Sequence, residues 1–151
     1  MIEFTVHGIP KPAGSKRAFL NPKTKRIVVT DDCKTGRDWK ASMQAAAIEA
    51  MAGDDPATGP LGLHVTFWMP RPKSHYRKDG TVKESAPDWH DIRPDATKLL
   101  RCAEDAMTGI VWRDDAQVVS QEVTKRYADG SPRAVVRVWR IDAWTVRGDA
   151  A

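Results

Sequence analysis

The chain has little cysteine and no long apolar segment, and each absence narrows the range of possible proteins. Its 151 residues include two cysteines, Cys33 and Cys102, and neither belongs to a CxxC motif or a Cys/His cluster. A zinc site and a disulfide framework are therefore disfavoured, and a reducing cytosol fits this cysteine usage. No apolar run approaches the roughly 20 residues that cross a bilayer, and the alternating N-terminus does not resemble a signal peptide. We therefore expect a cytoplasmic protein that does not associate with membranes.

The sequence also lacks the motifs of several enzyme classes. It has no glycine-rich phosphate loop, no GxGxxG and no serine-nucleophile motif, which disfavours a sugar- or nucleotide-processing enzyme. The net charge of +4 and the pI of about 9.2 permit a nucleic-acid partner without requiring one. The length and the hydrophobic content of 41% predict one globular domain, residues 1–145, followed by a C-terminal tail, residues 146–151.

The apolar pattern predicts an α/β protein of the α+β kind, with a mixed β-sheet and two main helices. Alternating or turn-bounded segments predict strands at 2–7, 18–20, 26–30, 61–69, 116–127 and 132–142. Apolar residues spaced three and four apart predict helices at 35–52 and 95–108. Residues 70–94 contain four prolines and many charges without periodicity, and a loop this long is usually either functional or disordered.

Basic residues gather in two of the predicted loop regions. One follows Gly14, and the other surrounds Tyr76 in the long loop. Contact with DNA phosphates suits this composition, and an ordinary solvated surface is the alternative. The candidate phosphate contacts are Lys16, Arg17, Arg71, Lys73, Arg77 and Lys78.

Against this basic background, five acids gather around the second predicted helix and the turn after it: Asp95, Glu104, Asp105, Asp114 and Asp115. Asp95 follows a proline at the start of the helix, where a carboxylate also serves as a simple cap. Asp114 and Asp115 are adjacent before a strand, so one of them is expected to point away from the other. Acids that converge from the helix start and the returning strand repel each other unless a cation such as Mg²⁺ lies among them.

One face of the same helix carries polar side chains. Thr97, Arg101, Glu104 and Thr108 are spaced three and four residues apart and therefore share this face. Close to bound carboxylates, Arg101 would contact a scissile phosphate. A salt bridge with Glu104 or Asp105 is the alternative role for Arg101.

Four segments carry a resemblance to a known family. They are GIPKPAGSKRAF near the N-terminus, PDATKLLR at 94–101, DAMTG at 105–109 and WRDDAQV at 112–118, followed by Lys125. These segments resemble the RusA-type Holliday junction resolvases, small endonucleases common in phages and prophages. The family pattern is approximately P-D-x-D-N/K-L-x-K/R, then D-A-L-x-G, then W-x-D-D-x-Q-V, with a later lysine.

The resemblance implies a homodimer with a mixed α/β fold that cuts four-way DNA junctions symmetrically with Mg²⁺ or Mn²⁺. It assigns metal binding to Asp95 and Asp115, with Asp114 as the flanking acid. Arg101 stands at the position of a catalytic lysine or arginine, and Lys125 is a candidate DNA contact. A bacterial cytoplasm, with a phage or prophage origin, is implied in the same way.

The chain departs from the family pattern at Thr97, where the second acid of P-D-x-D is expected. A hydroxyl is a poorer ligand than a carboxylate for a hard divalent ion. Glu104 would restore the third carboxylate, or two acids with waters would suffice, since Mg²⁺ commonly retains several waters. The remaining alternative is a protein that binds branched DNA and cuts it poorly or not at all. His90 and Asp91 precede the motif and would shape the pocket.

Overall fold

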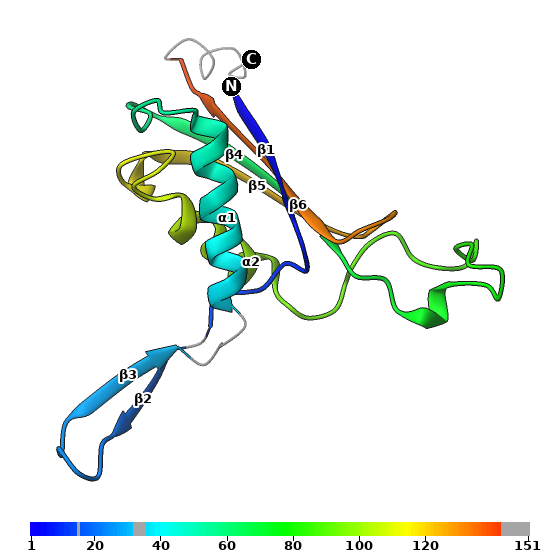
Figure 1. The fold of residues 1–151 in the computed structure, drawn as a ribbon, viewed down its shortest axis with the longest axis horizontal. Helices are drawn as coiled ribbons and strands as arrows, with labels where there is room; N and C mark the ends of the chain where they lie inside the picture. The colour runs from blue at the N-terminus through cyan, green and yellow to red at the C-terminus, as the bar shows by residue number, and fades with distance from the viewer. Residues whose placement is uncertain (15, 32–35, 143–151) are drawn as a thin grey trace, which may run out of the picture.

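The structure, a computed structural model, describes residues 1–14, 16–31 and 36–142. Its main sheet has the strand order β1-β6-β4-β5, with β1 at Ile2–His7, β4 at Leu61–Met69, β5 at Val118–Tyr127 and β6 at Arg133–Arg140 (Figure 1). β6 pairs antiparallel with both β1 and β4, whereas β4 and β5 are parallel. The predicted mixed sheet is therefore confirmed.

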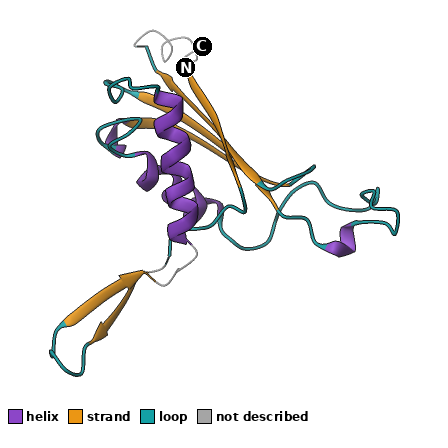
Figure 2. Cartoon of the chain, in the orientation of Figure 1, coloured by secondary structure: helices purple, strands orange, loops and turns teal. Residues whose placement is uncertain are grey.

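Two helices cover one face of this sheet: α1 at Gly36–Met51 and α2 at Ala96–Met107 (Figure 2). Both predicted helices are confirmed within a few residues. α1 buries Trp39, Met43 and Ala47 at a spacing of four. α2 ends before Gly109, whose φ of 84° is the left-handed conformation that terminates helices.

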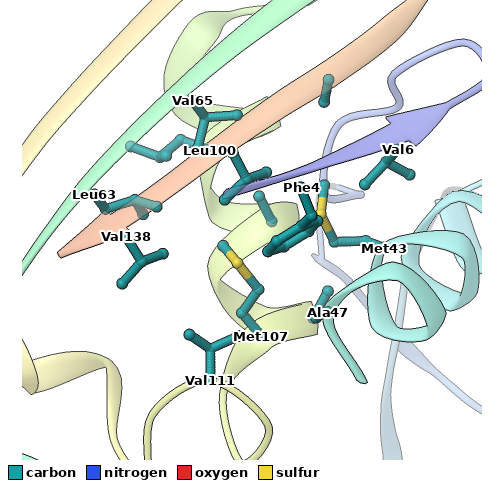
Figure 3. Packing of buried hydrophobic residues seen from close by; sticks show 14 of the residues in the cluster. Phe4, Val6, Met43, Ala47, Leu63, Val65, Leu100, Met107, Val111 and Val138 are labelled. Atoms are coloured by element: carbon teal, nitrogen blue, oxygen red, sulfur yellow. The ribbon is translucent and has the colours of Figure 1, made fainter. Parts of the chain in front are cut away.

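The core lies between the helices and the sheet (Figure 3). Alternate residues of a strand point to opposite faces, and the odd-numbered residues of β4 all point toward the helices. The predicted buried face of this strand is confirmed in full: Leu61, Leu63, Val65, Phe67 and Met69. Phe4 and Val6 of β1 complete this layer, and Cys102 is buried in α2. No helix in the described ranges is long and apolar enough to cross a membrane.

Two segments project from this core. A separate hairpin, β2 at Lys16–Leu20 and β3 at Ile27–Asp31, extends beyond one end of α1 (Figure 1). The second projection, residues 70–87, is called the basic arm below. It contains the short 3₁₀ helix η1 at Lys73–His75 and a bridge between Tyr76 and Val82. The structure gives this segment a defined fold, and its function stays a prediction.

Arg71 fixes the base of the basic arm. Its side chain is only 5% exposed, and its guanidinium donates to the carbonyl oxygens of Pro87 at 2.8 Å and Ala128 at 3.2 Å. It also lies 3.5 Å from the Asp88 carboxylate and 5.3 Å from the centre of the Tyr127 ring. DNA contact by Arg71 stays a prediction, and these bonds show that its guanidinium holds the arm against the sheet.

Candidate functional site

The first turn of α2 presents Asp95 at the mouth of a cavity. Asp95 occupies the N-cap position, and its side chain makes no capping hydrogen bond. Its carboxylate instead lies 3.6 Å from the Lys98 ammonium. The cavity has a volume of about 700 Å³, and its charged lining residues other than Asp95 are Lys11, Arg93 and Lys98. Three cations around one carboxylate form a site to which a phosphate would bind favourably.

Lys125 of β5 holds the segment that leads into Asp95. Its ammonium donates to the carbonyl oxygens of Ile92 and Pro94, both at 2.7 Å. These two bonds fix the backbone immediately before Asp95. Phosphate contact by Lys125 remains a prediction, and the bonds show that this lysine also positions the metal-ligand candidate.

His90 lies behind the same cavity. It is 6% exposed, it packs edge-on against Tyr127, and its Nδ1 makes no hydrogen bond among the described residues. Burial, followed by the charge of Lys125, lowers the pKa of His90 below its ordinary value. His90 is therefore neutral near pH 7, while Asp91, its neighbour, is exposed to solvent.

The other end of α2 is closed by a compact turn. The Thr108 hydroxyl donates to the Glu104 carbonyl at 2.9 Å and accepts from the Trp112 indole at 3.1 Å. The Trp112 ring is fully buried. This turn positions the acids that follow the tryptophan.

Asp114 and Asp115 have different roles in the 3₁₀ helix η2, which spans Asp115–Gln117. The Asp114 carboxylate accepts from the Ala116 amide at 2.8 Å, and the Gln117 side chain accepts from the Asp114 amide at 3.1 Å. The Gln117 amide group also donates to the Ala57 carbonyl at 2.9 Å. Asp114 is thus occupied in a capping box, while Asp115 is exposed.

Glu104 lies near enough to Asp115 for their charges to interact. It is partly buried, and it accepts a hydrogen bond from the side-chain amide of Gln121 on β5. Burial, then the charge of Asp115, then that of Asp105, raises the pKa of the Glu104 carboxyl above its ordinary value. Two carboxylates that repel each other at a half-buried position form a site to which a cation would bind favourably.

Within one chain, α2 separates the acids into two groups. Glu104 comes nine residues after Asp95, which corresponds to an axial distance of about 13 Å along the helix. Asp95 is at the helix start, and Asp115 follows the helix end. No three acidic, histidine or cysteine side chains in the described ranges come together in a way that would hold a metal. The expected convergence of Asp95 with Asp115 is therefore not seen in a single chain.

Arg101 and Thr97 lie between these groups on α2. Both are exposed. The described residues provide no ion pair for Arg101, although a salt bridge with Glu104 or Asp105 was the alternative interpretation. The Arg101 guanidinium is therefore available to an external anion.

The remaining candidate cations are on the two projections. Lys73, Arg77 and Lys78 are exposed on the basic arm, consistent with phosphate contact. Lys16 and Arg17 have backbones in β2, and their side chains lie outside the described part of the structure.

Two glutamines were missed as site residues from the sequence. Gln117 belongs to the WRDDAQV segment, so its motif position was a signal without an assigned role. Gln121 lies four residues later in β5, and only the packing of β5 against α2 reveals its contact with Glu104.

The fold is a small α+β domain in which one helix and the turn after it present carboxylates beside basic surfaces, an arrangement typical of enzymes that act on phosphodiesters. The sequence model of the family Endodeoxyribonuclease RusA matches residues 10–139, and this chain belongs to that family. The chain is also similar to YqaN of Bacillus subtilis (strain 168), described as an uncharacterized protein. The two are 27% identical over 146 residues, which covers 94% of this chain and 98% of YqaN. The match to an endodeoxyribonuclease family implies a DNA-cutting activity and branched DNA as the substrate.

Proposed function

We propose that this protein is a divalent-metal-dependent, structure-selective endonuclease that resolves four-way DNA junctions by paired phosphodiester incisions. The observation that carries the proposal is the charge interaction of Glu104 with Asp115, in a chain that has Thr97 where the family pattern has an acid. The carboxylate of Glu104, two turns after Thr97 on the same face of α2, compensates for the missing acid. The choice of Mg²⁺ or Mn²⁺ as the ion follows from the all-oxygen ligand set.

The residues present fit a hard divalent ion. Glu104 and Asp115 supply adjacent carboxylates whose mutual repulsion a cation would relieve, and Asp95 supplies an exposed third. Asp114 contributes by shaping the turn, since one of its oxygens is already used by the Ala116 amide. When bound, the ion supplies Lewis-acid activation of water and neutralises charge that develops on the phosphate.

A two-fold dimer would complete the site. Asp95 and Asp115 lie at opposite ends of α2, so a single chain holds the two acid groups apart. If the α2 helices of two protomers run antiparallel, Asp95 of one protomer approaches Glu104 and Asp115 of its partner. Such a symmetric pair has two equivalent sites, one for each of two strands.

The cations divide into two functions in this proposal. Lys11, Arg93 and Lys98 surround Asp95 and would bind the phosphate next to the cut, and Arg101 would stabilise the scissile phosphate. The exposed cations of the basic arm, together with Lys16 and Arg17, would contact DNA phosphates farther from the cut. Selection for the shape of the junction then comes from contacts with the DNA backbone rather than from contacts with the bases.

A second candidate is a branched-DNA-binding protein of the same fold that cuts weakly. Thr97 favours this candidate, because the exposed hydroxyl at this position leaves the helix start with one acid. This candidate predicts tight, salt-sensitive junction binding that does not change when Glu104 is altered.

A metal titration of single-turnover junction cleavage tests the proposal. The native protein should cut a synthetic four-way junction, and Glu104→Gln should need about tenfold or more Mg²⁺ or Mn²⁺ for the same rate, since losing a carboxylate weakens a hard-ion site. Thr97→Asp in the Glu104→Gln background should recover part of the loss. Junction binding without cleavage by the native protein, together with new cleavage in Thr97→Asp, would support the binding protein instead.

A further inference from the structure

Trp89 is a large aromatic side chain that lies outside the hydrophobic core. It is 61% exposed, whereas the next residue, His90, is buried. The Trp89 backbone is nevertheless held on the outer edge of β5. It forms a β-bridge with Arg126, and the flanking bonds are Tyr127 N–H to the Asp88 carbonyl at 2.8 Å and His90 N–H to the Lys125 carbonyl at 3.4 Å. Trp89 is thus presented to solvent from a fixed backbone, not from a free loop tip.

A stack of arginine and tryptophan side chains supports the Trp89 ring. The Arg126 guanidinium lies 4.7 Å from the centre of the Trp89 ring and 5.6 Å from that of Trp68. Arg133 lies 4.7 Å from the Trp68 ring on the same sheet. Among the described residues Arg126 has no ion pair, so its charge remains available to a phosphate while its plane stacks on the rings.

The same segment leads directly to the candidate site. Asp95 is six residues after Trp89, and the Lys125 ammonium fixes the carbonyl oxygens of Ile92 and Pro94 between them. A group stacked on Trp89 would therefore be held at a defined position relative to Asp95.

We propose that Trp89 is a stacking platform for an unpaired nucleobase at the branch point of the DNA, with Arg126 supporting the ring and contacting the adjacent phosphate. The proposal rests on the proposed function as a junction nuclease and assigns to it a residue that selects for branched substrates. Both faces of a base are covered by its neighbours in continuous duplex, so only a base freed at a branch or end presents a face to the indole. An exposed aromatic beside cations is the combination by which proteins bind unstacked bases without sequence preference.

The test compares Trp89→Ala and Trp89→Phe with Ile92→Ala as the matched control. Ile92 is 60% exposed on the same segment, but its aliphatic side chain cannot stack. Binding is measured without divalent ions, by anisotropy, to an immobile four-way junction and to a linear duplex of equal length. A 2-aminopurine at the branch point reports stacking on Trp89 through a change in its fluorescence.

We expect Trp89→Ala to lose about 5- to 100-fold in junction affinity, the range for one base–aromatic stack, and to change duplex affinity by less than about twofold. Trp89→Phe should retain most of the affinity, and Ile92→Ala should resemble the native protein. The 2-aminopurine change should disappear only in Trp89→Ala.

Four results would overturn the proposal. Equal losses of affinity for the junction and for the duplex in Trp89→Ala would mean that Trp89 contacts DNA of either shape. An unchanged affinity for the junction would mean that Trp89 has no role in binding. Conversion of a native dimer to a monomer by Trp89→Ala, measured by light scattering, would assign the side chain to an interface between copies. Failure of the native protein to bind the junction at all would reject the proposed function and this inference with it, whereas native cleavage with an unaltered Trp89→Ala variant rejects this inference alone.

Discussion

Replacing Arg71 by alanine tests whether this side chain holds the basic arm or contacts DNA. The guanidinium is 5% exposed and donates to the Pro87 and Ala128 carbonyl oxygens, which would lose their partner in Arg71→Ala. Hydrogen bonds from a charged group contribute roughly 1.5–3 kcal/mol, but Asp88 is largely exposed and regains water at little cost. We therefore expect a loss of about 2–3 kcal/mol, and a fall in Tm of about 4–12 °C for a domain of this size.

Arg77→Ala is the matched control for this experiment. Arg77 lies on the same arm, is exposed and makes no ion pair with the described residues, so its removal should change stability by less than about 0.5 kcal/mol. Arg77→Ala should instead lower the slope of log affinity against log salt by about 0.9, the value for one lost phosphate contact. Thermal unfolding by circular dichroism and salt-dependent binding measure the two effects. If Arg71→Ala unfolds at the same temperature as Arg77→Ala and also reduces the salt slope, the assignment of Arg71 to the arm's base is wrong.

Three further changes probe the site itself. The raised pKa of Glu104 means that its ionised form is unfavourable in the folded chain, so this group's contribution to stability is lost as pH rises from its unfolded pKa through its folded pKa. Without metal, Glu104→Gln should therefore raise the free energy of unfolding by on the order of 0.5 kcal/mol near pH 7 and leave it unchanged near pH 3. A lower free energy of unfolding near pH 7, measured by thermal unfolding without metal, would contradict the repulsion that acts on Glu104. Asp114→Ala removes the cap of η2 and should cost about 1 kcal/mol in urea denaturation, with reduced cleavage because Asp115 is less well positioned. Lys125→Met should weaken metal-dependent cleavage while leaving the salt slope of DNA binding unchanged, whereas a slope reduced by about 0.9 would make Lys125 a phosphate contact.

The elements that the sequence predicted well are those set by local periodicity. The inward face of β4 and the apolar face of α2 follow from spacings of two and of three to four, which the burial of Phe67 and Leu99 confirms. The order of the strands does not follow from such patterns. β5 and β6 are neighbours in the sequence, yet β4 lies between them, because α2 and the long segment before it form the crossover that makes β4 and β5 parallel.

The candidate site was predictable in its residue types and less so in its geometry. The sequence did not predict that Asp114 would cap η2, because that contact depends on the turn that Asp115–Gln117 forms. The sequence could not distinguish the buried Arg71 from the exposed Arg77. Burial of the Arg71 guanidinium depends on the carbonyl oxygens of Pro87 and Ala128, which belong to other segments of the chain. The contact of Glu104 with Gln121 likewise depends on how α2 lies against β5.

The most direct test of the account is to map the cuts made in a four-way junction by the native protein, Asp115→Asn and Asp105→Asn. Asp115 is a proposed metal ligand, whereas Asp105 is exposed on α2, is not a proposed ligand, and acts on the site only through its charge on Glu104. The account predicts metal-dependent nicks at symmetric positions on two strands, lost in Asp115→Asn and retained in Asp105→Asn. Nicks that persist unchanged in Asp115→Asn would contradict the central claim that the acids flanking α2 carry the reaction.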